Sequence, residues 1–193
     1  SFYSNIPGLK VITVSNPYDA KGLLKSAIRD NDPVLFMESE RMYGEKGEIP
    51  DGEYLLPIGV ANVAKEGKDV TIVSFGKMMK VALGAAEELA KEGIDCEVID
   101  LRTIRPLDEA TIINSVKKTN RLVVVDEHFP YGSIATEVAF RVQRHAFDHL
   151  DAPVVRVTQA DTPLPFAPNL IDASLPSVER VVNAVKSVAY VGA

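Results

Sequence analysis

Residues 69–108 constrain the fold of this chain most, because they read as a strand, a helix and a second strand separated by glycines. The first strand, 70–73, is a short β-branched run of the kind found in strands buried on both faces. From Met78 onward apolar residues recur at spacings of three and four, which predicts an amphipathic helix, and Gly93 can end it in the left-handed conformation. A second strand follows over 96–101. Two strands joined in this way predict a parallel, right-handed βαβ unit.

The same alternation of strands and helices occupies most of the chain. It predicts an α/β fold with an open, mainly parallel sheet that has helices on both faces. Residues 60–64 are expected to form an edge hairpin with the strand that follows, and the prolines within 161–168 exclude regular structure there. Asp108 is a preferred helix N-cap. The remaining predicted elements are the strands 9–15, 33–37, 121–125 and 153–157, and the helices 19–28, 108–118, one beginning near 134, and 176–188.

A stretch without periodicity separates two βαβ patterns. Residues 38–58 are rich in Glu, Gly and Pro, as connections between domains are. We therefore predict the end of one α/β domain over 1–44, a linker over 45–58 and a second domain over 59–193. The chain opens SFYSN, with neither Met nor a signal peptide. We expect a fragment of a longer protein.

Charge and hydropathy exclude some classes of partner. The chain has 21 basic and 27 acidic side chains and a formal net charge of −6, which argues against nucleic acid because phosphate binding needs concentrated basic surface. No apolar run approaches the roughly 20 residues of a membrane span, so we expect no membrane partner. The single cysteine, Cys96, lies within a predicted strand and is expected to be a buried hydrophobe in a reducing compartment.

Polar residues at the ends of the strands are the first candidates for chemistry, because open parallel sheets bind ligands beyond those ends. Asp126, Glu127 and His128 could act as general acid and base. Neighbouring residues at a strand end point in different directions, however, so we favour contacts within the loop and at a helix N-terminus. The four predicted ends are 74–76, 100–102, 126–128 and 158–159.

Other candidates have weaker support. His145 and His149 are four residues apart and could form a metal pair, but no third ligand is near them in the sequence. Gly76 and Gly132 each precede a predicted helix, where backbone amides could hold an anion. Neither glycine belongs to a nucleotide-binding motif. The residues alone name no reaction.

Three segments resemble the β subunits of thiamine-diphosphate-dependent 2-oxo acid dehydrogenases. The end of their pyrimidine-binding domain is similar to IPGLKVITVSNPYDAKGLLKSAIRDNDPVLFMESERMYG. The transketolase C-terminal domain that follows is similar to GKDVTIVSFGKMM and VIDLRTIRPLDEATIINSVKKTNRLVVVDE. A third segment resembles the pyruvate dehydrogenase branch of the family most closely: LDAPVVRVTQADTPLPFAPNLIDASLP. The resemblance covers essentially the whole chain, and it assigns 1–44 to the first domain and 59–193 to the second.

The resemblance implies an E1 component that decarboxylates pyruvate and passes the acetyl group to a lipoyl arm of E2. Its implied partners are an E1 α subunit, which holds thiamine diphosphate and magnesium, a second β subunit and the E2 subunit-binding domain. The family's active-site glutamate and histidine fall upstream of Ser1. The resemblance therefore implies no catalytic or cofactor-binding residue in this chain, which we expect to be inactive alone. It implies the bacterial cytoplasm or, in a eukaryote, the mitochondrial matrix.

One ion site is implied as well. The segment AIRDNDP resembles a loop that binds a structural potassium ion through backbone carbonyls, which maps to Ala27, Ile28, Asp30 and Asp32. The alternative is a helix end followed by a turn.

Other functions stay open. They are a branched-chain or acetoin dehydrogenase β subunit, a deoxyxylulose-phosphate synthase or transketolase, and a flavodoxin-like binding or receiver module. A receiver needs an acidic pair after its first strand, which 74–76 does not supply.

Overall fold

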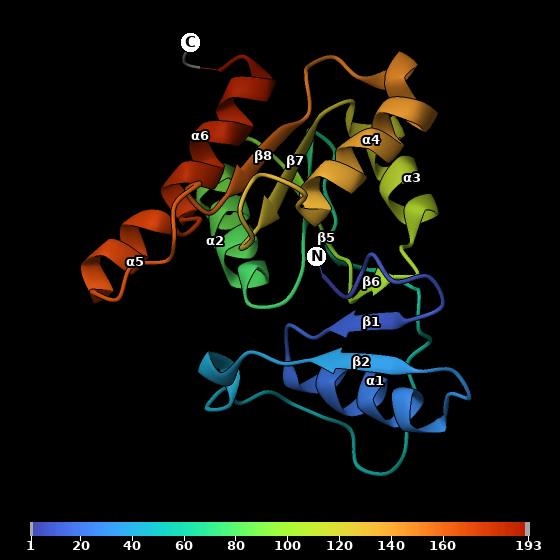
Figure 1. The fold of residues 1–193 in the computed structure, drawn as a ribbon. Helices are drawn as coiled ribbons and strands as arrows, with labels where there is room; N and C mark the ends of the chain where they lie inside the picture. The colour runs from blue at the N-terminus through green and yellow to red at the C-terminus, as the bar shows by residue number, and fades with distance from the viewer. Residues whose placement is uncertain (1, 192–193) are drawn as a thin grey trace.

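The computed structural model describes residues 2–191, and its centre is a five-stranded sheet in the order β3-β5-β4-β7-β8 (Figure 1). The strands β4 (Val70–Ser74), β5 (Cys96–Asp100), β7 (Leu122–Asp126) and β8 (Val155–Thr158) are parallel, and β3 (Asn62–Lys65) is antiparallel at one edge. Every residue of β4, β5 and β7 is buried. The mainly parallel sheet predicted from the sequence is confirmed.

Helices cover both faces of this sheet. The helices α2 (Met78–Lys91) and α6 (Val178–Ala189) share one apolar core with it, and α3 (Glu109–Thr119) and α4 (Ile134–Ala146) share the other (Figure 1). The two cores form because alternate side chains of each buried strand point to opposite faces of the sheet. The two-faced α/β architecture is therefore confirmed.

Local signals place the ends of these helices. Gly93 lies at φ +85 just beyond α2, and the Ile94 amide donates to the Leu89 carbonyl at 3.0 Å. The Asp108 carboxylate accepts the Thr111 amide at 3.1 Å and caps α3. Both signals were read from the sequence, and both are confirmed.

A smaller unit precedes the large sheet. Its strands β1 (Lys10–Thr13) and β2 (Val34–Met37) are parallel and are joined by α1 (Pro17–Arg29). Leu56 and Ile58, from the connection to the large sheet, pack against α1 and the strands. This is the second βαβ unit expected from the sequence.

A short strand joins the two units. The strand β6 (Thr103–Arg105), which was not predicted, pairs antiparallel with β1 and completes a sheet in the order β2-β1-β6. The chain reverses at Arg102, whose φ is +55. The Thr103 hydroxyl is buried and accepts the Gly59 amide at 3.0 Å, so a polar residue is satisfied inside this joint.

The predicted edge hairpin is wrong. The strand β3 pairs with β5 and not with β4, the strand that follows it. The connection lies against the start of β5, where the amides of Lys68 and Asp69 donate to the Asp95 carbonyl at 3.0 and 2.9 Å. Only glycine fits at Gly67, because a Cβ atom there would lie 2.2 Å from the Cys96 carbonyl carbon.

Three shorter helical segments were not predicted. They are α5 (Pro168–Ser174), which follows the proline-rich segment, and the 3-10 turns Glu40–Met42 and Phe147–His149. Each has at most seven residues, which is too short for a helical periodicity to appear in the sequence.

Candidate functional site

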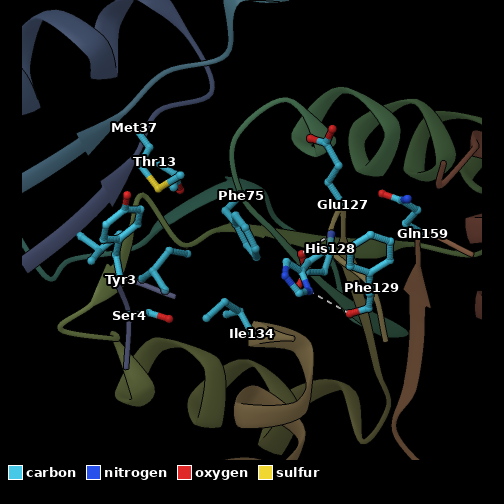
Figure 2. A pocket seen from close by; sticks show the side chains of 13 residues that line it. Tyr3, Ser4, Thr13, Met37, Phe75, Glu127, His128, Phe129, Ile134 and Gln159 are labelled. Atoms are coloured by element: carbon cyan, nitrogen blue, oxygen red, sulfur yellow. Dashed lines mark hydrogen bonds between the residues drawn. The ribbon is translucent and has the colours of Figure 1, made fainter. Parts of the chain in front are cut away.

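A cavity of about 300 Å³ lies where the carboxyl ends of β4 and β7 face the smaller unit (Figure 2). It lies at the edge of the sheet where the sequence placed ligand binding. Its walls are largely apolar, however, and its polar lining groups include Thr13, His128 and Gln159. The apolar walls are formed by Tyr3, Met37, Phe75, Ile104, Phe129 and Ile134.

Asp126, Glu127 and His128, the predicted acid–base group, all line this cavity, but their polar groups are engaged in contacts of the surrounding loop and helix. The Asp126 carboxylate accepts the amides of His128 at 2.9 Å and Ala135 at 3.2 Å, so it fixes its own loop and the first turn of α4. Glu127 forms an ion pair with Lys77. The His128 Nδ1 atom lies 3.0 Å from the Phe129 carbonyl (Figure 2). These are the loop and helix-capping contacts that the sequence favoured.

A second polar cluster at the strand ends was not predicted from the sequence. Asp100, at the end of β5, accepts hydrogen bonds from the Ser15 hydroxyl and from the Arg102 amide. The Arg102 guanidinium donates two hydrogen bonds to the buried Asp19 carboxylate, at 2.9 and 2.6 Å. Burial raises the pKa of Asp100 to about 6. The cluster links the smaller unit to the large sheet, and its members are too far apart in sequence to have been recognised as a motif.

The two histidines do not form a metal pair. The His145 Nε2 atom lies 3.2 Å from the Glu109 carboxylate, and the His149 carbonyl accepts a hydrogen bond from Asn120 at 2.7 Å. Over residues 2–191 no group of three or more His, Cys, Asp or Glu side chains is arranged to hold a metal ion.

The glycines that precede two of the helices have a left-handed backbone. Gly76 and Gly132 lie at φ +55 and +65, ahead of α2 and α4. The Ala135 amide in the first turn of α4 already has the Asp126 carboxylate as its acceptor, so this amide does not need an anion. We assign no anion site to either glycine.

The carboxylates at the strand ends do not fit a magnesium–diphosphate site. Asp100 and Asp126 are held by protein amides and a hydroxyl, and Glu127 is paired with Lys77. Magnesium needs carboxylate oxygens that are free to enter an octahedral shell. No step of thiamine chemistry is assigned to these residues.

The loop of the expected potassium site is organised around a lysine. The Lys10 ammonium donates to both Asp30 oxygens, at 2.8 and 2.6 Å, and lies 3.0 Å from the Asp32 carboxylate. Its hydrogen bond lowers the pKa of Asp30. The Ala27 carbonyl accepts the Asp30 amide at 3.3 Å, and Ile28 lies in the last turn of α1. A potassium ion would therefore depend on the backbone carbonyls, because the carboxylates already face a cation.

Cys96 is a buried thiol in β5, and its burial raises its pKa to about 12. The thiolate that nucleophilic or redox chemistry requires is therefore disfavoured. The expectation of a buried hydrophobe is confirmed.

Among the residues that the structure describes, no helix has the length and apolar character to cross a membrane.

Family models match almost the whole chain. Residues 59–181 match the transketolase C-terminal domain, and residues 1–46 match the transketolase pyrimidine-binding domain. The chain therefore belongs to the transketolase family. The fold expected from the resemblance is confirmed, and a flavodoxin-like module is disfavoured.

Curated relatives narrow the class further. The chain is 53% identical over 191 residues to the pyruvate dehydrogenase E1 component subunit beta of Rhizobium meliloti, across 98% of this chain and 42% of that protein. It is 52% identical over 194 residues to the mitochondrial subunit beta-1 of Oryza sativa, across 98% of this chain and 52% of that protein. It is 50% identical over 184 residues to the acetoin:2,6-dichlorophenolindophenol oxidoreductase subunit beta of Cupriavidus necator, across 95% and 54%. The chain spans about half the length of these relatives.

A solved structure has the same fold. A split-gene transketolase, described as an inactive beta4 tetramer, superposes with a TM-score of 0.80 at 26% sequence identity. The match covers 99% of this chain and 60% of that protein.

Proposed function

We propose that this chain acts as the C-terminal part of the β subunit of a pyruvate dehydrogenase E1 component. The assembled enzyme uses thiamine diphosphate and magnesium to decarboxylate pyruvate oxidatively, and it transfers the acetyl group to a lipoyl arm of E2. The observation that carries the proposal is the identity of 53% over 191 residues with such a subunit. Within the chain, 1–44 belongs to the pyrimidine-binding domain, 45–58 is the linker and 59–193 is the transketolase C-terminal domain.

The proposed role of these residues is assembly. The carboxylates of Asp100, Asp126 and Glu127 serve internal hydrogen bonds and ion pairs, which supports a structural role for the strand ends. The proposed partners are an E1 α subunit, a second β subunit and the E2 subunit-binding domain. The beta4 tetramer of the split-gene transketolase supports association between β subunits.

An assay of pyruvate decarboxylation with an artificial electron acceptor tests the function. The isolated chain should give no turnover, whereas the complete β subunit that contains this sequence should give turnover when combined with its E1 α subunit, thiamine diphosphate and magnesium. Turnover by the isolated chain would contradict the assembly role. A complete assembly that does not use pyruvate would contradict the substrate.

Acetoin is the second candidate substrate, because relatives that act on it are about as similar to this chain as several pyruvate dehydrogenase subunits are. The same assembly should be offered pyruvate, acetoin and a branched-chain 2-oxo acid in parallel. A higher kcat/KM for pyruvate supports the main proposal. A higher kcat/KM for acetoin would show that acetoin, and not pyruvate, is the substrate.

A structural potassium ion at the carbonyls of Ala27, Ile28, Asp30 and Asp32 is a separate proposal. The support is the resemblance of the loop, and the close approach of Lys10 to both carboxylates opposes it. Thermal unfolding should be compared in potassium chloride and in sodium chloride at equal ionic strength. A higher Tm in potassium supports the site, and equal Tm values refute it.

The proposed location follows the relatives. Those from Oryza sativa and Arabidopsis thaliana are named as mitochondrial proteins. We propose the mitochondrial matrix if the source is a eukaryote and the cytoplasm if it is a bacterium.

A further inference from the structure

The cavity between the two units has the size of a site for a small molecule. Its volume of about 300 Å³ lies at the lower end of the range for ligand pockets, which fits a single ring with short substituents. In Figure 2, Thr13 and Met37, the last residues of β1 and β2, lie on one side of it, and His128 and Phe129, which follow β7, lie on the other. A ligand inside the cavity would therefore contact both units.

Aromatic side chains form much of the wall. The rings of His128 and Phe129 pack edge to face with their centroids 5.4 Å apart. Phe75 and Tyr3 add two more rings to the lining, one from each unit. Aromatic rings attract one another in offset-stacked and edge-to-face arrangements. These walls therefore favour a flat aromatic ligand over an aliphatic one.

The carboxylates that line the cavity are already engaged. Asp126 accepts two backbone amides, and Glu127 forms an ion pair with Lys77. Over residues 2–191 no lysine or arginine side chain lines the cavity. An anion placed there would lie beside two carboxylates without a lining cation, and a cation would find both carboxylates occupied by other partners. A neutral ligand is therefore favoured.

Two uncharged polar residues of the lining have unused hydrogen-bonding capacity. The Thr13 hydroxyl oxygen is buried and has no hydrogen-bond partner in the part of the chain that the structure describes. Gln159 is 7% exposed, and within the same residues its side-chain amide makes only one hydrogen bond, a donation to the Thr162 carbonyl at 3.5 Å. Buried polar groups normally have partners. A ligand with hydroxyl or amide groups at both ends would supply them, because Thr13 and Gln159 lie on opposite sides in Figure 2.

We propose that this cavity binds a small neutral aromatic molecule that carries hydrogen-bonding groups at opposite ends of its ring. One end bonds to the Thr13 hydroxyl and the other to the Gln159 amide, and the ring packs beside Phe75 and Phe129. The proposal goes beyond the assembly role, because it assigns a ligand to this chain itself. It does not depend on the substrate of the assembled enzyme.

Nuclear magnetic resonance of the nitrogen-15-labelled chain tests the proposal, with 4-hydroxybenzamide as the probe. Titration should shift the amide signals of Thr13, Phe75 and Gln159 in a saturable way, with a dissociation constant on the order of 1 mM or tighter for a ligand of one ring. The anion 4-hydroxybenzoate, which has the same shape, and the cation 4-hydroxybenzylamine should bind about tenfold more weakly or not at all. Thiamine diphosphate should not displace the probe.

Matched variants test the two polar contacts. Thr13→Val keeps the shape of the side chain and removes the hydroxyl, so it should raise the dissociation constant by about fivefold to tenfold. Thr13→Ser keeps the hydroxyl and should bind nearly as wild type does. Gln159→Leu should weaken binding by a factor similar to that of Thr13→Val. Circular dichroism should show the wild-type fold for each variant.

Several outcomes would overturn the proposal. One is the absence of saturable binding, and another is a set of shifts confined to the surface around Phe140 and Phe147, which would place the probe elsewhere on the chain. Equal affinity for the neutral, anionic and cationic probes would refute the proposed class of ligand. Wild-type affinity in both Thr13→Val and Gln159→Leu would refute the proposed contacts. Because no substrate and no E1 α subunit are used, these outcomes do not depend on the pyruvate assay.

Discussion

Asp100 is the carboxylic acid whose ionisation opposes folding near neutral pH. Burial raises its pKa to about 6 from an ordinary value of 3.8, and the nearby Asp19 carboxylate acts in the same direction. Hydrogen bonds from Ser15 and from the Arg102 amide act in the opposite direction and are weaker than the burial effect. The folded chain therefore holds the proton more tightly than the unfolded chain does. The contribution of this group to the free energy of unfolding is greatest below about pH 4 and falls as the pH rises to about 6.

Replacement of Asp100 by Asn should remove this pH dependence. The free energy of unfolding of Asp100→Asn, taken relative to that of wild type, should be higher at pH 8 than at pH 4 by an amount on the order of 2 kcal/mol, because the amide carries no charge to bury. Urea unfolding at the two pH values measures the difference. Asp161→Asn, which changes an exposed carboxylate outside this cluster, is the control and should show no comparable change. An equal effect of Asp100→Asn at both pH values would refute the interpretation.

The ion pair between Arg102 and Asp19 is the second test at this scale. The Asp19 side chain is 1% exposed, and Arg102 reaches it with two hydrogen bonds. Arg102→Ala should lower the free energy of unfolding by about 3 to 5 kcal/mol, because it leaves a buried carboxylate without its cation. Arg102→Lys should recover only part of the loss, since an ammonium cannot reproduce the paired geometry.

A double-mutant cycle with Asp19→Ala separates the pair from its surroundings. If the pair interacts as the structure indicates, the double variant should be more stable than the sum of the single losses predicts. Additive losses would show that the two side chains act independently. Chemical unfolding of the four proteins measures the cycle.

Single residues show which features of the fold a sequence can reveal. Gly93 and Asp108 act on backbone groups within a few positions of themselves, and both were predicted. Arg102 and Asp19 are 83 positions apart and meet only after both units have folded. No local sequence pattern can predict a pair so far apart in the chain.

At the scale of secondary structure, the path from β3 to β4 depends on one glycine. A Cβ atom at Gly67 would lie 2.2 Å from one backbone atom of Cys96 and 2.3 Å from the amide nitrogen of Glu97. Gly67→Ala should therefore lower the free energy of unfolding by about 2 kcal/mol or more, because the backbone of a central strand cannot move aside. Thermal or urea unfolding measures the loss.

Gly44→Ala is the matched control. A Cβ atom at Gly44 meets no atom within 4 Å, and its φ is not positive. This substitution should be neutral or should stabilise the chain by up to about 1 kcal/mol through the unfolded state. If the two variants unfolded alike, the close approach at Gly67 would not be real.

The elements that were predicted correctly are those with a long repeating pattern. The helices α2, α3, α4 and α6 have 11 to 14 residues and show their apolar faces in the sequence. The strand β6 has three residues, and the partner of β3 is decided by the path of the chain. The edge hairpin was wrong because pairing with the nearest strand is only a tendency.

At the scale of the whole molecule, the two units should unfold together. The sheet β2-β1-β6 takes strands from both, and Val11 of the smaller unit packs in the same core as Leu101 and Ile104. Urea unfolding followed by circular dichroism and by tyrosine fluorescence should give coincident transitions. Separate transitions would show that the joint is weaker than its contacts indicate.

Hydrogen exchange tests the same coupling between the two units strand by strand. In Arg102→Ala the amides of β1 and β2 should exchange faster than those of β4 and β7, because the variant weakens the joint and leaves the large sheet intact. Uniform acceleration over all four strands would argue against a local effect. Mass spectrometry of peptides from each strand measures the rates.

The position of the candidate site was predicted from the sequence, but the apolar lining of its cavity was not. Parallel strands put Asp100, Asp126 and Thr158 at one edge of the sheet, as the sequence indicated. The apolar cavity between the units was not foreseen, because its walls come from segments that only the folded chain brings together. The segment DLRTIRPLD, which identified the family, also contains Arg102 and β6, and its residues form most of the joint.

Because β6 pairs with β1, the two units should stay together even when the chain is cut within the predicted linker 45–58. A site-specific protease site introduced at the exposed Gly52, which has open space around it, would divide the chain into two polypeptides. Three strands, the ion pair of Arg102 with Asp19 and the hydrogen bond from Ser15 to Asp100 would still bridge the cut. The protein should therefore behave as a split pair whose halves copurify after cleavage and reassemble when they are expressed separately.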